Sequence, residues 1–432
     1  MMVKNLTREG ASSAPRLQED LTMPALDGMR ILDMTQYEAG TSCTQALAWL
    51  GADVVKIEQP GVGDPGRGVR TGTLNSPYFI NWNSNKRSVT INLQDPKGRE
   101  LLLEMLPHYD VFVENYGPGV MERLNLTYEV MKEINPAIIY GRLKGFGLSG
   151  PWQDFKCYDM VAQAAAGAFS VTGEKDGPPM MPGSTVGDSG TGTELALAIT
   201  AAYVQRQRTG EGQFIEITMQ EAMTYFMRTR IAYSQWGERV APRNGNAAGA
   251  PTNLYPCKMT PDSEERGGDN EWVYIMVVTS RMWDTLCATI DRPELLLDPR
   301  FEDMWKRNEN GDELYAEISK WTKTRTKWEV MDILGEAGVP CSAVLDTYDL
   351  FHNPHFKERG FVHDLEHPAH GTIRLLGWAP RMSKSDVPLV RAPLLGEHTS
   401  QVLSDDLGLS AGDLQEMEAA GIIGGEPVFP AK

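Results

Sequence analysis

Residues 29–58 read MRILDMTQYEAGTSCTQALAWLGADVVKIE, in which two apolar runs flank a segment rich in alanine and leucine. Met29–Met34 and Ala52–Glu58 have the length and composition of buried strands, whereas Thr44–Leu50 favours a helix. Two strands joined through a helix form the repeating unit of a parallel sheet, with a right-handed crossover. These residues therefore predict an α/β fold.

The same alternation continues through the first half of the chain. Asp95 followed by Pro96 is a helix-start signal ahead of Lys97–Leu106, and a further helical pattern covers Tyr128–Ile134. Additional strand-like runs are Ser88–Leu93, Asp110–Glu114, Ala137–Leu143 and Phe214–Met219. The sequence thus predicts a large, Rossmann-like domain built on a parallel sheet.

Polar or glycine-rich residues follow the predicted strands. The segments at the strand ends are 35–40, 58–61, 115–119 and 144–147. In parallel sheets ligands bind beyond the carboxyl ends of the strands. We therefore expect a ligand crevice where these segments meet.

The glycine-rich segment Gly61–Gly66 matches the dinucleotide-binding pattern G-x-G-x-x-G. That fingerprint must open a helix and be followed, about 20 residues later, by an acidic side chain. Here Pro65 is followed by Gly68, Gly72 and Pro77, and the region around Lys86 is basic. Because both requirements fail, this segment is not expected to bind NAD or FAD.

Asp188 stands in a segment of small residues, 182–192, ahead of the apolar run Glu194–Tyr203. Glycine allows a bulky partner to approach this carboxylate closely, but the pattern alone favours a turn or helix-capping aspartate. Gly-Asp-Ser-Gly also resembles the serine-protease loop, but no histidine precedes Pro107 and the following residues favour a helix. Thr191 stands where a nucleophile elbow requires glycine, so Ser189 is not expected to react.

The composition of the chain indicates which binding partners and which cellular location to expect. The 432 residues carry a net charge of −17, which argues against nucleic acid or an anionic membrane surface. No run approaches the length of a membrane-spanning helix, and residues 1–24 lack the apolar core of a signal peptide. Five cysteines include no C-x-x-C pair, and their odd number suits a cytoplasmic location.

The histidines do not predict a metal site. Six of the seven fall between His352 and His398, where Pro354, Pro368 and Gly371 interrupt helical spacing. A metal cluster needs ligands at regular spacing, so scattered surface histidines are expected instead.

Seven sequence blocks, in order, carry a resemblance to a known family. They are Leu26–Asp33, Leu50–Glu58, Asn83–Ser88, Val113–Gly119, Tyr158–Ala164, Gly187–Ser189 and Arg391–His398. The chain resembles the class III coenzyme A transferases, which include formyl-CoA transferase, carnitine CoA-transferase and α-methylacyl-CoA racemases. The resemblance covers nearly the whole chain, roughly residues 25–425.

This resemblance implies that Asp188 is a covalent nucleophile. The carboxylate would attack an acyl-CoA thioester, pass through a mixed anhydride and an aspartyl-CoA thioester, and then deliver CoA to an acceptor acid. Backbone amides near Gly187–Gly190 would stabilise the oxyanions. The implied partners are an acyl-CoA and a carboxylic acid. No cofactor would be bound permanently, since the CoA thioester is a substrate. The implied assembly is an interlocked homodimer.

The resemblance also assigns the residues that contact CoA. Arg123 and Lys156 would hold phosphates, while Tyr158 and Asp159 would line the reacting end. The implied CoA contacts are Glu38, Ala39, Gln59, Ile91, Asn92, Leu93, Gln94, Asn115, Tyr116, Gly117, Arg123, Lys156, Cys157, Tyr158 and Asp159.

The domain organisation combines these patterns. Residues 1–24 are expected to form an N-terminal extension and 25–220 a large α/β CoA-binding domain. A helical pattern at Gln220–Trp236 predicts a linker helix within residues 221–245. Strand-like and helical runs then predict a smaller α+β domain at 246–345, and residues 346–432 would form a return linker and the end of the large domain.

Departures from the family pattern bear on the substrate. Glu38 stands where formyl-CoA transferase has glutamine, and Gln59 stands at a position that is typically arginine. The segment 246–253 replaces a run of glycines that would close over the intermediate. Together these departures argue against oxalate and formate as substrates, and the added negative charge near Asp188 favours an acceptor that is not a compact dianion.

Two other functions remain as alternatives. The racemases carry Gly-His-Asp where this chain has Cys157-Tyr158-Asp159, and an α-proton transfer needs a base better matched than tyrosine. Transfer is therefore favoured over racemisation. A non-catalytic CoA-binding homologue is the weaker alternative, because Asp188 and its small neighbours are present.

Overall fold

The computed structural model describes residues 23–237, 239–265 and 270–424. Its larger part is a six-stranded sheet with the order β3-β2-β1-β4-β5-β6, in which all neighbouring strands are parallel. The predicted parallel α/β sheet is confirmed, and its strand order is that of Rossmann-like folds. The strands are β1 (Arg30–Met34), β2 (Asp53–Glu58), β3 (Lys86–Thr90), β4 (Val111–Glu114), β5 (Ile139–Lys144) and β6 (Phe214–Thr218).

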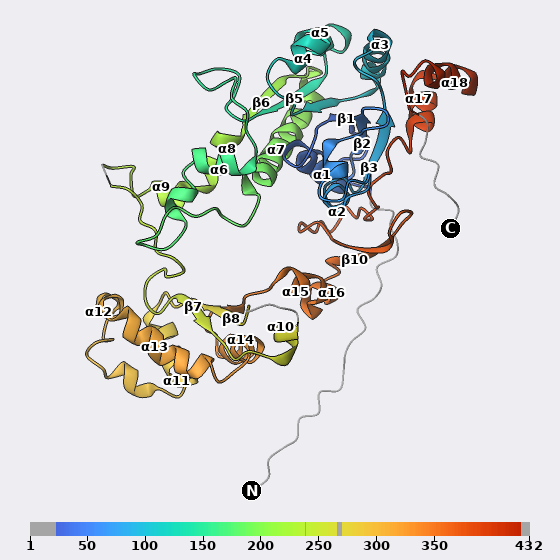
Figure 1. The fold of residues 1–432 in the computed structure, drawn as a ribbon. Coiled ribbons are helices and arrows are strands. Elements are labelled where there is room, and N and C mark those ends of the chain that lie inside the picture. The colour runs from blue at the N-terminus through green and yellow to red at the C-terminus, as the bar shows by residue number, and fades with distance from the viewer. Residues whose placement is uncertain (1–22, 238, 266–269, 425–432) are drawn as a thin grey trace.

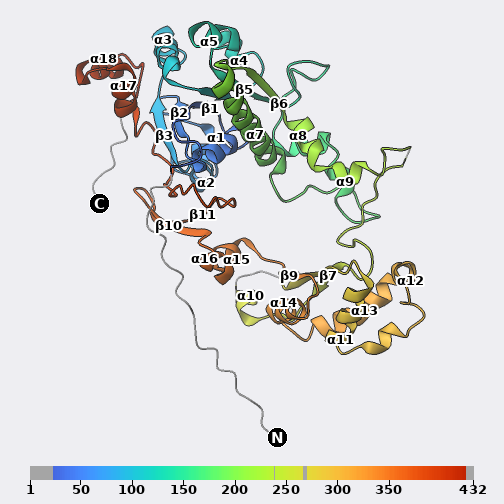
Figure 2. The same ribbon diagram turned by 180° about the vertical axis from the view of Figure 1, so that it is seen from behind.

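Helices cover both faces of this sheet, which explains why its strands are almost continuously apolar. Ile31 of β1 packs with Leu47 and Ile199 on one face, whereas Leu32 packs with Leu102 and Leu403 on the other. The helices of this part are α1 (Ala39–Trp49), α2 (Pro77–Trp82), α3 (Pro96–Met105), α4 (Val120–Leu124), α5 (Tyr128–Ile134), α6 (Asp159–Ala165), α7 (Val186–Thr209), α17 (Thr399–Leu407) and α18 (Ala411–Ala419). Figures 1 and 2 show α17 and α18, near the end of the chain, beside β3 and α3.

The third strand ends earlier than expected. The prediction was Ser88–Leu93, but the strand covers Lys86–Thr90. Ile91 and Leu93 remain buried, which is why the apolar pattern extends past the strand. The backbone, however, turns towards the end of the chain, and the Asn92 amide donates to the Ile422 carbonyl at 2.7 Å.

A smaller unit has its own sheet and its own core. Its strands β7 (Asn253–Pro256), β8 (Trp272–Ile275) and β9 (Cys341–Ala343) pair antiparallel. Figure 1 shows this unit set apart from the parallel sheet and joined to it by two stretches of chain. Its helices are α10 (Pro261–Glu265), α11 (Ser280–Thr289), α12 (Met304–Glu309), α13 (Gly311–Thr322) and α14 (Lys327–Glu336).

The two connecting stretches contain short elements. The outgoing one holds α8 (Met219–Phe226) and α9 (Arg228–Ile231), so the single long helix predicted at Gln220–Trp236 is wrong. The break falls after Thr224, Tyr225 and Phe226, residue types with modest helix propensity. The returning one holds α15 (Thr347–His352), α16 (Pro354–Glu358) and the antiparallel pair β10 (Val362–His367) and β11 (Gly371–Leu376). Within the described residues, no helix is both long and apolar enough to cross a bilayer.

Candidate active site

A cavity of about 240 Å³ lies at the carboxyl ends of β1, β4 and β5. Asn115 and Gln36 bind the first two strand ends together, since the Gln36 amide donates to Asn115 Oδ1 at 2.8 Å and Asn115 Nδ2 donates to the Gln36 carbonyl at 2.9 Å. The lining residues are Gln36, Tyr37, Ala39, Asn115, Tyr116, Gly117, Pro118, Leu143, Lys144, Gly145, Gln153, Phe155, Lys156, Cys157, Tyr158, Asp188 and Met219. The structure therefore brings together eight of the residues singled out in the sequence: Ala39, Asn115, Tyr116, Gly117, Lys156, Cys157, Tyr158 and Asp188.

Asp188 lies in the first turn of α7, not in the loop before it, because this helix begins at Val186. The buried Asp159 defines this helix entrance: its Oδ1 accepts the Asp188 amide at 2.9 Å, and its Oδ2 accepts from Gln163 Nε2 at 2.8 Å. Gly187 makes the approach possible, since a Cβ there would lie 2.7 Å from the Asp159 carbonyl oxygen. Asp159 thus holds the backbone that presents the Asp188 carboxylate.

Glu38 and Asp159 add two further carboxyl groups beside Asp188. Burial, together with Glu38 and Asp159, raises the pKa of Asp188 to about 8. Burial also raises the pKa of Glu38 to about 7, even though Thr185 Oγ1 donates a hydrogen bond to Glu38 Oε1. The Asp188 carboxyl therefore holds its proton to higher pH than an ordinary aspartate does, and its ionised form is an unusually basic carboxylate.

Tyr78, on α2, is a site residue that the sequence analysis missed. Its side chain hydrogen-bonds to Glu38, and burial next to the charges of Glu38 and Asp188 raises the pKa of its hydroxyl. The available signal was local: Ser76 followed by Pro77 is a helix start, and Ser76 caps α2 by accepting the Phe79 amide. Nothing local indicated that this helix would face Asp188.

Two lysines line the cavity, one exposed to solvent and the other buried in an ion pair. Lys156 is exposed on the wall. Lys144, which begins one of the predicted strand-end segments, is buried and paired with Glu114 at 3.1 Å, and it donates to the Tyr116 carbonyl. Arg123 lies on α4, is exposed and does not line the cavity. Lys156 is thus the cavity-wall cation with its charge open to solvent, while Lys144 is already neutralised.

The predicted CoA contacts that follow β2 and β3 do not line the cavity. Gln59 Nε2 donates to Asn92 Oδ1 at 3.3 Å, and Asn92 Nδ2 donates to the Gly421 carbonyl at 3.3 Å. Together with Ile91, Leu93 and Gln94 they follow β2 and β3, on the far side of β1 from β4. The structure does not bring this group to Asp188.

The altered glycine segment also lies elsewhere in the chain. Residues 246–253 contribute to a separate cavity of about 760 Å³ with Glu174, Asn308 and Tyr315. The segment just before it is fixed to residues 173–177, because the Gly245 amide donates to the Gly173 carbonyl at 2.9 Å. Within one chain, this segment does not cover Asp188.

The small residues around Asp188 serve helix packing. A Cβ at Gly192 would lie 2.1 Å from Ser42 Oγ and 2.4 Å from the Ala39 carbonyl oxygen, so glycine lets α7 lie directly against α1. Ser189 Oγ donates to the Thr185 carbonyl at 2.9 Å within the helix. The amides of Asp188 and Ser189, expected as oxyanion donors, already donate to Asp159 and Thr185.

The fold, the cavity and Asp188 agree with what the chain resembles among known proteins. The sequence matches CoA-transferase family III over residues 26–399, and the chain belongs to this family. Accordingly, it is a CoA-transferase enzyme.

Among curated relatives, formyl-CoA:oxalate CoA-transferase from Rhodopseudomonas palustris (strain BisA53) is 39% identical over 92% of this chain and 97% of its own length. The enzyme of that name from Streptomyces coelicolor is 38% identical, with 93% and 100% covered. A solved CAIB/BAIF family protein from Brucella suis has a TM-score of 0.77 and 29% identity, covering 88% of this chain and 99% of that one. Rv3272 from M. tuberculosis has a TM-score of 0.74 and 27% identity, covering 87% and 98%.

Proposed function

We propose that the enzyme moves CoA from an acyl-CoA donor to a carboxylic acid through covalent intermediates on Asp188. The observation that carries this proposal is the Asp188 carboxylate on the wall of the strand-end cavity, with its pKa raised to about 8 by burial, Glu38 and Asp159. A basic carboxylate is a better nucleophile than an ordinary one when it is ionised. The site therefore combines access with reactivity.

The proposed reaction balances without any further reactant. The Asp188 carboxylate attacks the thioester carbonyl, the C–S bond breaks, and an acyl–aspartyl anhydride and CoA thiolate result. The thiolate attacks the aspartyl carbonyl of the anhydride and releases the donor acid, which leaves an aspartyl-CoA thioester. The acceptor carboxylate then attacks that thioester, the C–S bond breaks, and a second anhydride and free CoA thiolate result. Finally, the returning thiolate takes the acceptor acyl group, and the Asp188 carboxylate is restored. No permanently bound cofactor takes part in this route.

In the proposed binding mode, an acyl-CoA enters the cavity between the ends of β4 and β5, and its phosphates lie near Lys156. Tyr37, Phe155 and Tyr158 give the entrance aromatic surface, and Tyr37 and Tyr158 contact edge to face with centroids 6.1 Å apart. Such surfaces suit an adenine ring or the pantetheine chain. Arg123, Gln59 and the residues from Ile91 to Gln94 would then contact only the outer part of the ligand.

For the acceptor we propose a monocarboxylic acid. Relatives at 38–39% identity are named formyl-CoA:oxalate CoA-transferases, so formate and oxalate are the reference acids. Glu38, when ionised, repels a second carboxylate on the acceptor. Because the pKa of Glu38 is raised to about 7, the preference for a monocarboxylate over oxalate should grow as the pH rises above 7.

We further propose a cytoplasmic homodimer. The surface formed by α7, α8 and the following segment exposes several large apolar side chains, including Leu197, Phe226 and Trp236. Exposed apolar surface of this kind favours association. All five cysteines are free thiols, as is usual in a reducing compartment. Sedimentation velocity would detect the dimer, and a monomer at micromolar concentration would contradict it.

A CoA-exchange assay tests the proposed function. Purified enzyme is incubated with a panel of acyl-CoA donors and acids, and the acyl-CoA products are read by mass spectrometry. Asp188→Ala should abolish exchange. The neighbouring Ser189→Ala, which loses only a hydrogen bond within the helix, should retain it. Substantial exchange by Asp188→Ala, or equal loss in both variants, would overturn the role of Asp188.

A further inference from the structure

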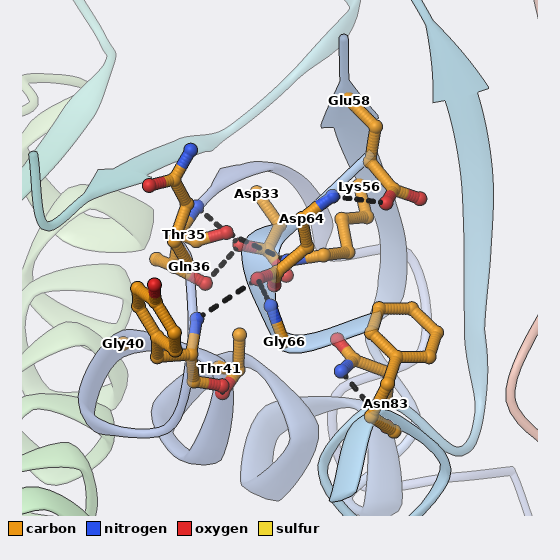
Figure 3. A network of polar contacts seen from close by, with 12 residues as sticks. Asp33, Thr35, Gln36, Gly40, Thr41, Lys56, Glu58, Asp64, Gly66 and Asn83 are labelled. Carbon is orange, nitrogen blue, oxygen red and sulfur yellow. Dashed lines mark hydrogen bonds and ion pairs between the residues drawn. The ribbon is translucent and has the colours of Figure 1, made fainter. Parts of the chain in front are cut away.

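The glycine-rich segment Gly61–Gly66 has a structural role beside the active site. It opens only a short 3₁₀ helix, Pro65–Gly68, and its acidic residue Asp64 is buried. Asp64 Oδ1 accepts the Gly66 amide at 2.7 Å and the Tyr37 amide at 3.0 Å. Its Oδ2 pairs with Lys56 Nζ at 2.9 Å. Figure 3 shows Asp64 at the centre of this network, between Lys56 and Gly66. The segment therefore connects β2 to the loop after β1.

Two neighbours fix Asp64 in this position. Glu58 Oε2 accepts the Asp64 amide at 2.9 Å, and Glu58 is itself held by Arg67 through bonds of 2.6 and 2.7 Å. Lys56 Nζ donates to the Thr35 carbonyl at 2.6 Å. Lys56 and Arg67 are both 0% exposed. Such a network leaves Asp64 little freedom to move.

Burying this many charges is not an efficient way to gain stability, because desolvation offsets the attraction between them. The buried network contains three carboxylates and three cations: Asp33, Glu58 and Asp64 with Lys56, Lys86 and Arg67. Its contacts converge on residues 35–41, the loop after β1 and the first turn of α1, which form one side of the active-site cavity.

That loop contains an unfavourable backbone conformation. Tyr37 has φ 58°, a left-handed value that is uncommon for a residue other than glycine. Its amide is held by Asp64, and its carbonyl accepts from Thr41 Oγ1. The turn at Tyr37 directs the chain into α1 with Glu38 at the helix start, where Glu38 meets Thr185. The conformation at Tyr37 thus determines where Glu38 lies relative to Asp188.

We propose that Asp64 is a positioning residue for the reaction at Asp188: it holds the Tyr37 backbone in its left-handed turn and thereby places Glu38 and the cavity wall. Asp64 contacts no reacting atom and acts only through this loop. The catalytic consequence rests on the proposed function of Asp188, whereas the effect on the loop can be measured without any substrate.

A matched pair at Tyr37 tests the turn itself. Tyr37→Asn and Tyr37→Val both remove the ring, but asparagine tolerates the left-handed conformation and a β-branched valine does not. We expect kcat for exchange to be roughly tenfold lower in Tyr37→Val than in Tyr37→Asn, a difference of about 1.4 kcal/mol. KM for acyl-CoA should change similarly in both. Equal kcat values would overturn the proposal.

Hydrogen exchange at the Tyr37 amide tests Asp64 directly. Asp64→Ala removes the acceptor, whereas Asp64→Asn keeps Oδ1 and should restore much of the protection. We expect at least tenfold faster exchange at this amide in Asp64→Ala, with a parallel fall in kcat. Asp349→Ala breaks another buried pair, with Lys327 at 2.9 Å, and controls for lost stability; its Tyr37 amide should exchange as in wild type.

The outcomes separate the two proposals. Wild-type protection of the Tyr37 amide in folded Asp64→Ala would overturn the positioning role, whatever the activity. Faster exchange with unchanged kcat would overturn it too, because the loop would move without consequence. Absence of transferase activity in the wild-type enzyme would count against the proposed function alone, and the exchange rates would still decide whether Asp64 fixes the loop.

Discussion

Replacing Glu38 with glutamine should make Asp188 ionise at lower pH. Glutamine keeps the size of the side chain and an oxygen that accepts from Thr185, but it removes the negative charge. Glu38 is the first cause, after burial, of the raised pKa of Asp188. The attacking form of Asp188 is the carboxylate, so the rate of acyl-enzyme formation should rise with pH through about 8 in the wild type.

The size of the effect follows from that value. If removing the charge lowers the pKa of Asp188 by about one unit, a typical scale for a like-charge neighbour, the ionised share at pH 7.5 rises from about a quarter to about three quarters. The acylation rate at this pH should therefore rise about threefold. At pH values well above 8 both enzymes are ionised and the advantage should disappear. Oxalate should also become a better acceptor, because the repelling charge is gone.

The assay is rapid quench of the enzyme with an acyl-CoA and no acceptor, following the burst of donor acid that is released as the aspartyl-CoA thioester forms, between pH 5 and 9. Glu317→Gln, on α13 of the smaller unit, serves as a matched control for the same change elsewhere. If the midpoint of the pH dependence of the burst rate is unchanged in Glu38→Gln, or lies at higher pH than in wild type, Glu38 does not raise the pKa of Asp188.

Three further outcomes are expected. Because the folded-state pKa of Asp188 is raised, the folded protein loses stability as the pH rises from about 4 to 8. Asp188→Asn should therefore unfold at a higher denaturant concentration than wild type at pH 8, and at nearly the same concentration at pH 4. A difference between the two proteins that stays constant across this pH range would contradict the raised pKa. Lys156→Ala should raise KM for acyl-CoA by about tenfold or more, and Arg123→Ala should raise it by less, since Lys156 lines the cavity and Arg123 does not. A larger KM increase in Arg123→Ala than in Lys156→Ala, from initial-rate measurements, would mean that the phosphates bind near α4. Gly192→Ala should lose about 1–3 kcal/mol in urea unfolding, because its Cβ would overlap Ser42 Oγ; wild-type stability would mean that α7 and α1 are not packed so closely.

Local sequence patterns were sufficient for the sheet and for part of the cavity. Apolar runs marked the strands, and parallel strands bring their carboxyl ends to one edge, which is why Asn115 could be grouped in advance with the segments 35–40 and 144–147. The family resemblance added Tyr158 and the role of Asp188, because the small-residue pattern alone favoured a turn or helix-capping aspartate.

The remaining features depend on contacts between distant segments. Asp159 fixes the start of α7 through the Asp188 amide, and Tyr78 reaches Glu38 from a separate helix. Asn92 joins residues near Ile422, more than three hundred positions away, instead of the cavity. No spacing rule links such pairs, because the fold alone brings them together.

Trapping the covalent intermediate would show whether Asp188 is the nucleophile. Enzyme incubated with an acyl-CoA is treated with hydroxylamine, digested and mapped by mass spectrometry. The proposed mechanism predicts a hydroxamate on the peptide containing Asp188, formed only when acyl-CoA is present and absent from Asp188→Asn. CoA exchange with no modification at Asp188, or a hydroxamate on another carboxylate such as Glu38 or Asp159, would contradict it.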